Sequence, residues 1–302
     1  MRILISGASG LIGSALVAKA TALGHEVVRL VRSPAMATDR TARLWDPARG
    51  VLDPAAVPGF DAVVNLAGEN IAGRWTRAKK HRILRSRVLA TRLLATTLAG
   101  LSEPPRVFVS ASAIGYYGNR GDEEMTEQSG PGTGFEPQVC CDWEHAAAAA
   151  KERGIRTVFA RFGIVLSAAG GALAKMLPAF RLGLGGVVGS GEQYWSWIAI
   201  EDAVNAIFHL VETEALAGPV NVVSLEPTTN REFTEALGMA LRRPTIFPLP
   251  EFAVKLLFGQ MGEEVLLSST RVKPARLLET AFQFTRPHLD AALAHALAPR
   301  KS

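Results

Sequence analysis

Short apolar runs alternate with amphipathic stretches through the first half of the chain. The apolar runs are rich in β-branched residues and predict strands at residues 2–6, 25–31, 60–68, 106–112 and 156–166. The amphipathic stretches between them predict helices at residues 14–23, 75–100 and 139–153. Strands that are apolar throughout and joined by helices are typical of a parallel sheet covered on both faces. We therefore expect an α/β fold with a doubly wound parallel sheet.

The pattern becomes irregular after residue 166. Glycine and aromatic residues gather before a predicted helix at 201–212, and a strand at 219–224 and a helix at 230–241 follow. Prolines then interrupt the segment PTIFPLPEF, and short helices are predicted in the tail. We predict a main domain over residues 1–166. Residues 167–302 are predicted to form a smaller irregular lobe with a helical tail, interleaved with the main domain and covering the open end of the sheet.

The composition is that of an ordinary globular protein, with 302 residues, 48% hydrophobic and 20% charged. No apolar run is long enough to span a bilayer, and the first residues enter a strand rather than a secretory signal, so we expect a soluble cytoplasmic protein. The net charge of +5 is dispersed along the chain. Its densest basic run, at 74–87, predicts the wet face of a helix rather than a nucleic-acid surface.

Adjacent cysteines, Cys140 and Cys141, follow the segment TGFEPQV. Their spacing suits neither a disulfide nor a zinc site, so we expect no bound metal. We interpret Cys140 as a buried, inert thiol on an early helical turn. The preceding segment is predicted to be an exposed loop, which would leave the carboxylate of Glu136 in solvent.

A glycine-rich turn joins the first predicted strand to the first predicted helix. Glycines in such a turn permit a tight bend, close approach of the backbone to a pyrophosphate, and close packing of helix on strand. The free N–H groups at the start of the helix attract phosphate. This context indicates a Rossmann-type dinucleotide site, with contacts predicted from Gly7, Ser9, Gly10, Leu11, Ile12 and Gly13.

The end of the second strand indicates which dinucleotide is bound. An acidic residue there would hold the ribose hydroxyls of NAD, whereas an arginine accommodates a 2′-phosphate. The sequence reads RLVRSP, with Arg32 and Ser33 and no acidic residue. We therefore predict NADP(H); the alternative is that Arg32 is a solvated loop residue.

The segments GASGLIG, DAVVNLAG, VSASAIGYYG, ARFGIVL and WSWIAIEDAVNAI together resemble the extended branch of the short-chain dehydrogenase/reductase family. More narrowly, NLAGENI, RLGLGG, GSG and PLP resemble its atypical epimerase-like subfamily of NADP-binding proteins. The likeness covers essentially the whole chain. It implies further cofactor contacts from Asn65, Leu66, Ala67, Gly68, Arg82, Arg87, Ser110, Ile164 and Val165.

Enzymes of this family use a tyrosine as general acid–base, with a lysine four residues later. Aligning Glu144 with the family's glutamate places Glu136 and Cys140 at those two positions, and residues 132–150 contain no tyrosine or lysine. The resemblance implies Ser112 as the catalytic serine. Tyr116 and Tyr117, which follow a strand at the ligand-binding edge of the sheet, are the other candidate catalytic residues. For each tyrosine the alternative is packing under the loop or shaping of the pocket.

Two functions remain open. The first is an NADP(H)-dependent oxidoreductase or epimerase-like enzyme that transfers hydride to or from an unknown small molecule, held between residues 112–117 and a glycine-rich loop at 180–200. The second is a non-catalytic NADP(H)-binding redox sensor or regulatory protein, which the missing tyrosine–lysine pair favours. A nucleic-acid-binding module is a distant third. We expect a monomer or a homodimer.

Overall fold

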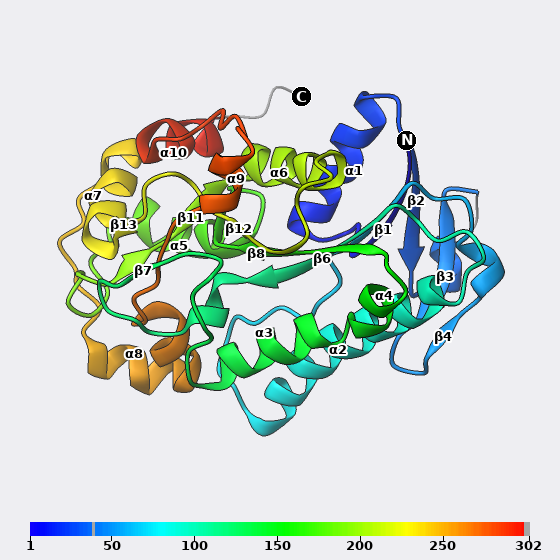
Figure 1. Ribbon diagram of the computed structural model, residues 1–302. Helices are drawn as coiled ribbons and strands as arrows, with labels where there is room; N and C mark the ends of the chain where they lie inside the picture. Colours follow the sequence, from blue (N-terminus) through cyan, green and yellow to red (C-terminus); the bar gives the residue numbers. More distant parts are fainter. Residues whose placement is uncertain (38–39, 299–302) are drawn as a thin grey trace.

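A central sheet organises the computed structural model, which describes residues 1–37 and 40–298 (Figure 1). The strand order is β12-β8-β6-β5-β1-β2-β3-β4, with every neighbouring pair parallel except β3 and β4. Its strands are β1 (Arg2–Ser6), β2 (Glu26–Val31), β3 (Ala42–Asp46), β4 (Val51–Leu52), β5 (Ala62–Asn65), β6 (Val107–Ala113), β8 (Arg156–Phe162) and β12 (Gly218–Val222).

Helices cover both faces of this sheet, as expected for a doubly wound fold (Figure 1). On one face lie α1 (Leu11–Ala22) and α6 (Ile200–Glu212). The other face carries α2 (Arg77–Ala99), α3 (Phe135–His145) and α4 (Ala148–Glu152). The predicted α/β, Rossmann-type fold is confirmed.

The first strand illustrates why the central strands carry apolar residues on both faces. Ile3 and Ile5 lie in the core beneath α1 and α6, whereas Leu4 lies in the core beneath α2 and α4. Successive strand side chains point to opposite faces, so both faces need apolar residues. Burying each of these side chains stabilises the fold by about 1.5–3 kcal/mol relative to exposure.

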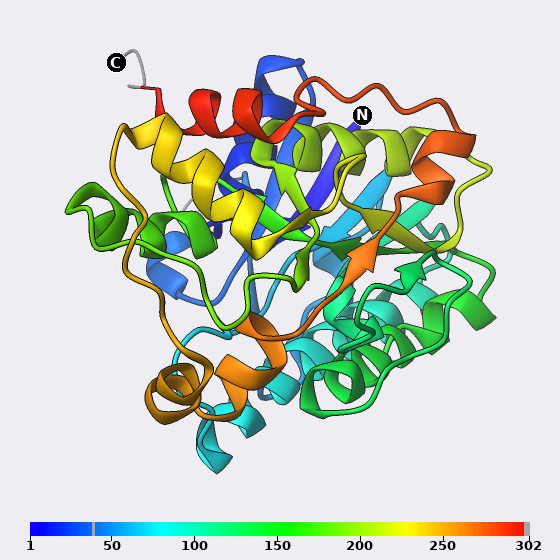
Figure 2. The ribbon, with the colours of Figure 1, turned by 90° about the vertical axis from the view of Figure 1, so that its left-hand side faces the viewer.

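Smaller elements are built around one end of the sheet. Three two-stranded pairs join β9 (Ile164–Leu166) to β11 (Trp197–Ala199), β10 (Tyr194–Trp195) to β13 (Thr228–Thr229), and β7 (Glu124–Met125) to β14 (Arg271–Val272). The remaining helices are α5 (Gly171–Arg181), α7 (Asn230–Leu241), α8 (Glu251–Phe258), α9 (Ala275–Glu279) and α10 (Leu289–Leu297). Helices α7 and α10 lie side by side over a separate apolar core (Figure 2).

Single turns connect several of these elements. Short 3₁₀ turns occur at Pro34–Met36, Pro54–Ala56 and Ile114–Tyr117, and a π turn at Gly262–Leu266 follows α8. Within the described part of the chain, no helix combines the length and apolarity that crossing a membrane requires.

Several predicted element boundaries change, for example that of the strand predicted over 60–68, which is Ala62–Asn65, and three others are informative. The first helix begins at Leu11 rather than residue 14, directly after the glycine turn. The strand predicted over 156–166 breaks at Gly163, where a side chain would lie 2.5 Å from the Ser196 carbonyl oxygen, and β9 then pairs with β11. The helix predicted over 139–153 begins at Phe135 and is interrupted between α3 and α4.

Candidate functional site

The glycine turn lies between β1 and α1, at the carboxyl end of the sheet. Gly7 has φ +69°, and a side chain on it would meet the Leu66 carbonyl oxygen at 2.5 Å. A side chain on Gly13 would lie 2.2 Å from the Gly7 carbonyl oxygen. The N–H of Gly10 donates to that same oxygen. Gly10 is the N-cap residue of α1, and no side chain there accepts a hydrogen bond from the first N–H groups of the helix. The backbone therefore requires glycine here and leaves the helix N-terminus available to phosphate.

A buried polar network supports the neighbouring loop at residues 66–70. The Ser6 hydroxyl donates to Asn65 Oδ1 at 2.6 Å, and Asn65 Nδ2 donates to Thr91 Oγ1 at 2.8 Å. Trp143 Nε1 donates to the same Thr91 oxygen, and Ser110 Oγ lies 3.4 Å from Asn65 Nδ2. The Asn65 and Ser110 side chains thus lie behind the loop and fix it to the sheet. Their predicted contacts with the cofactor stay predictions.

Two of the predicted arginines differ in their surroundings. Arg87 Nη1 donates to the carbonyls of Glu69 and Ile83, at 3.0 and 3.1 Å. A side chain on Gly68 would lie 3.3 Å from the Arg87 guanidinium carbon. Arg82 is exposed, with Nε 3.6 Å from Glu69 Oε1. Arg87 therefore forms part of the wall of the site, while Arg82 lies at its rim.

The other predicted cofactor residues lie at neighbouring strand ends. Arg32 is exposed just beyond β2, and Ser33 precedes the following 3₁₀ turn. Ile164 and Val165 lie in β9, next to the carboxyl end of β8. Parallel strands end at one edge of the sheet, so these residues and the glycine turn lie around the same edge.

The hydroxyl of Ser112 is part of a closed, charged network. It donates to Glu144 Oε1 at 2.7 Å, and Arg161 binds both oxygens of the same carboxylate at 2.8 Å. Ser112 and Arg161 are each 3% exposed. The hydroxyl therefore contacts α3 and faces away from the outer surface of the site.

The two candidate tyrosines have different environments. Tyr117 is fully buried; its hydroxyl donates to Asn221 Oδ1 at 2.7 Å and accepts from Arg161 Nη1 at 3.0 Å. Burial raises the pKa of Tyr117 above its ordinary value, in spite of the nearby Arg161 charge. Tyr116 is half-buried, and the Arg161 guanidinium carbon lies 3.5 Å from its ring centroid. The structure favours packing for Tyr117, and the catalytic roles predicted for these residues stay predictions.

A small cavity of about 40 Å³ opens beside the last residue of β6. Ala113 lines this cavity, whereas Ser112 is not among its lining residues and donates to Glu144 farther along α3. The lining residues come from α2, α3, β6 and the loop before α2: Ile71, Trp75, Ile83, Arg87, Ala113, Phe135, Glu136, Val139, Cys140 and Trp143.

The expectation that Glu136 lies in an exposed loop is wrong. It belongs to the first turn of α3, where it is half-buried and lines the cavity. Burial, and next the negative charge of Glu264, raise the pKa of Glu136 to about 7, while Arg87 acts to lower it. The cause of the error is tertiary: Glu264 accepts hydrogen bonds from the N–H groups of Phe135 and Glu136, at 3.1 and 2.8 Å, and so caps α3.

Cys140 follows one helical turn after Glu136 and lines the same cavity. It is a free thiol, 2% exposed, and burial together with the charges of Glu136 and Glu144 raises its pKa. A thiol in this state is a poor nucleophile, which agrees with its interpretation as an inert packing residue. Among the described residues, no group of three or more His, Cys, Asp and Glu side chains is arranged to hold a metal.

The glycine-rich segment before Trp195 forms tight turns rather than an aromatic-lined pocket. Gly189 and Gly191 have φ +61° and +82°, and Trp195 and Trp197 are buried in the core beneath α7 and α10. Both indole N–H groups lie buried without a hydrogen-bond partner in the described structure.

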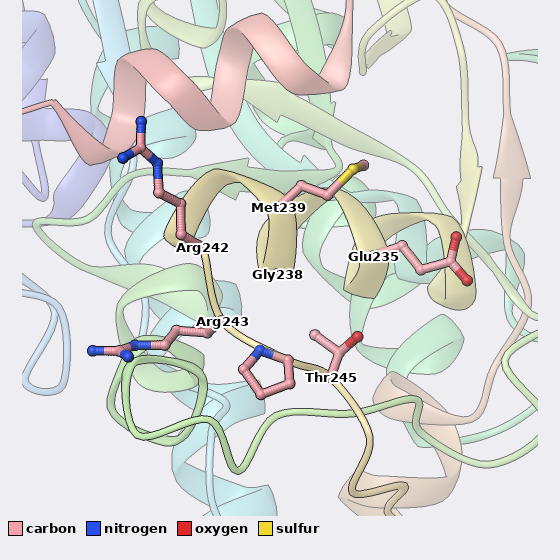
Figure 3. A pocket seen from close by; sticks show the side chains of 7 residues that line it. Glu235, Gly238, Met239, Arg242, Arg243 and Thr245 are labelled. Atoms are coloured by element: carbon pink, nitrogen blue, oxygen red, sulfur yellow. The ribbon is translucent and has the colours of Figure 1, made fainter.

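A wider hollow, about 530 Å³, lies elsewhere, along α7 and the turn after it (Figure 3). The guanidinium groups of Arg242 and Arg243 extend outward rather than toward the other lining side chains. The hollow therefore presents no convergent set of chemical groups and is no competitor for the sheet edge as a ligand site.

Comparison with known proteins agrees with this geometry. Residues 3–223 match the NAD dependent epimerase/dehydratase family, and residues 249–296 match a domain of unknown function, DUF1731. The chain is 44% identical over 296 residues to an epimerase family protein of Mycobacterium bovis, with 97% of each chain covered. These matches confirm the family resemblance carried by the sequence motifs.

Two solved structures are similar over nearly the whole chain. Human epimerase family protein SDR39U1, solved with NADPH, has a TM-score of 0.90 and 37% identity, covering 98% of this chain and 99% of that one. A nucleoside-diphosphate sugar epimerase of Corynebacterium glutamicum has a TM-score of 0.81 and 35% identity, covering 98% of this chain and 58% of that one.

Proposed function

The chain belongs to the NAD dependent epimerase/dehydratase family, and from this premise we propose that it binds NADPH and transfers hydride between the cofactor and a small molecule. The observation that carries the proposal is the turn from β1 to α1. Side chains at Gly7 and Gly13 would collide with backbone atoms, and the open N-terminus of α1 is suited to a pyrophosphate.

The preference for NADPH rests on the end of β2. Arg32 is exposed there, and the segment RLVRSP contains no acidic residue to hold an unphosphorylated ribose. A guanidinium binds phosphate through paired, charge-assisted hydrogen bonds. The NADPH present in the human relative's structure supports the same choice.

When bound, NADPH supplies the hydride, and the protein must orient it and manage one proton. The loop at 66–70 and Arg87 form a wall at the carboxyl ends of β5 and β6, where α/β proteins hold their ligands. The cavity beside Ala113 and Glu136 continues this wall. It gives the nicotinamide end of the cofactor an enclosed, partly apolar neighbour.

Titration with NADPH and NADH tests the cofactor. We expect tighter binding of NADPH, and we expect Arg32→Gln to weaken NADPH by about tenfold or more with little effect on NADH. The magnitude corresponds to loss of a hydrogen bond to a charged group, about 1.5–3 kcal/mol. The exposed Arg49→Gln is the matched control. Stronger binding of NADH than of NADPH by the wild-type protein would contradict the proposal.

The second candidate function is an NADP(H)-binding sensor without turnover. It is favoured by the Ser112 and Tyr117 hydroxyls, both of which are engaged in buried protein contacts. NADPH oxidation against a panel of aldehydes, ketones and quinones separates the two functions. Tight cofactor binding with no oxidation of NADPH by any compound would favour the sensor.

A further inference from the structure

The first turn of α3 places a carboxyl group at the ligand-binding edge of the sheet. A side chain on Gly115 would lie 2.3 Å from Glu136 Cδ, so the glutamate packs directly against the turn after β6. Its carboxyl shares the 40 Å³ cavity with Ala113, the last residue of β6. The family resemblance places Glu136 where related enzymes hold their proton-transferring tyrosine.

A fixed cation lies beside this carboxyl. Arg87 lines the same cavity, is held by the carbonyls of Glu69 and Ile83, and lies over the Trp143 ring at 5.0 Å. Its charge acts on both Glu136 and Cys140. The arginine thus brings a positive charge to the region where the resemblance would place a lysine and this chain has Cys140.

The Glu136 carboxyl also differs from the other carboxylates around α3. Glu144 is bound by Ser112 and Arg161, and Glu264 accepts from two backbone N–H groups and from Gln260 Nε2. Within the described residues, the carboxyl oxygens of Glu136 take part in no hydrogen bond. A carboxyl that lines a cavity and has unused hydrogen-bonding capacity is suited to a ligand that completes it.

We propose that Glu136 is the residue that exchanges a proton with the substrate, and that Arg87 is the cation whose charge acts on it. This inference rests on the proposed hydride chemistry. In reduction, the substrate's carbonyl carbon receives the hydride with its electron pair, and the carbonyl oxygen takes the proton of the Glu136 carboxyl. The products are an alcohol, NADP⁺ and the Glu136 carboxylate, which regains a proton from water. Oxidation runs through the same transfers in reverse.

The charges around Glu136 suit this exchange. Glu264 faces it from the π turn, Arg87 faces it from α2, and the neutral thiol of Cys140 follows it on α3. Burial and Glu264 hold its pKa at about 7, close to neutral pH. A group titrating there can both release and accept a proton under ordinary conditions.

The ratio of NADP⁺ to NADPH affinity, measured from pH 5.5 to 8.5, tests the inference without any substrate. The oxidised nicotinamide ring carries a positive charge that the reduced ring lacks, so a carboxylate beside it favours NADP⁺. We expect the relative affinity for NADP⁺ to rise by about tenfold as pH increases through about 7, if the ring lowers the Glu136 pKa by about one unit. The 2′-phosphate titrates in both NADP⁺ and NADPH, so its effect on the two affinities cancels in their ratio.

Three variants identify the titrating group. Glu136→Gln should flatten the profile, whereas the exposed Glu152→Gln should leave it unchanged. Glu264→Gln removes a neighbouring negative charge and should move the inflection to lower pH. Arg87→Gln removes the positive charge and should move it to higher pH. If Glu136→Gln does not fold, the opposite shifts in the other two variants still decide the question.

The outcomes separate the inference from the proposed function. Tight binding with a flat wild-type profile would overturn the role of Glu136 and leave cofactor binding intact. An inflection that persists in Glu136→Gln would also overturn it. Failure of the wild-type protein to bind either form of the cofactor would instead overturn the proposed function.

Discussion

The two ends of α3 beside β6 differ in how completely their polar groups are paired. The Ser112 hydroxyl donates to Glu144, which Arg161 also binds, and Arg161 donates to the Tyr117 hydroxyl in a closed network. Earlier on α3, Glu136 lines a cavity together with Ala113, and its carboxyl has no hydrogen-bond partner among the described residues. Full pairing rigidifies a core. The comparison shows a fully paired polar network beside a carboxyl that keeps unused hydrogen-bonding capacity.

The strongest way to break the closed network is Arg161→Met. This change leaves Glu144 buried without its cation, and breaking a buried ion pair costs about 3–5 kcal/mol of unfolding free energy. Urea denaturation measures the loss. The exposed Arg153→Met should change stability by less than about 0.5 kcal/mol. Equal stability of the two variants would show that the network is not structural.

Replacing Glu136 in the cavity should instead stabilise the protein at pH values above about 7. The pKa of Glu136 rises from 4.5 to about 7 on folding, so the folded protein holds a proton that the unfolded chain loses between those values. This contribution to stability is complete below pH 4.5 and is lost as pH rises through about 7. We therefore expect Glu136→Gln to be more stable than wild type at pH 8, by up to about 3 kcal/mol, and close to it at pH 4.5.

Urea denaturation of both proteins across this pH range gives the measurement, with Glu152→Gln as control. A wild-type stability profile parallel to that of Glu136→Gln would show that folding does not shift the pKa of Glu136.

The smallest expected effect is that of Ser112→Ala, which tests whether Ser112 supports the structure or takes part in catalysis. Ser112→Ala removes one hydrogen bond to a carboxylate that Arg161 still holds, which should cost about 1.5 kcal/mol. NADPH oxidation at saturating substrate should change less than tenfold. General acid–base groups contribute about 10²–10⁴-fold, so a loss of that size would place Ser112 in catalysis.

Local sequence patterns predict the structure correctly where the conformation depends on residues that are neighbours in the sequence. The apolar strands and the turn from Gly7 to Gly13 follow from patterns confined to a few positions, and the structure confirms them. The α/β class follows because both faces of each strand must be apolar.

Sequence reasoning failed where a distant residue decides the conformation. Phe135 and Glu136 lie between a glycine and a proline and were predicted to form a loop, but Glu264, more than a hundred residues later, caps them into a helix. Gly134, with φ +127°, permits the backbone to enter that helix.

Glu264 belongs to the segment 249–296 that matches a domain of unknown function, yet it bonds to the helix that carries Glu136. Its charge is one of the two causes that raise the proton affinity of that carboxyl. Replacing this one glutamate would therefore shift the pH at which the Glu136 carboxyl titrates, while every residue lining the cavity stays the same.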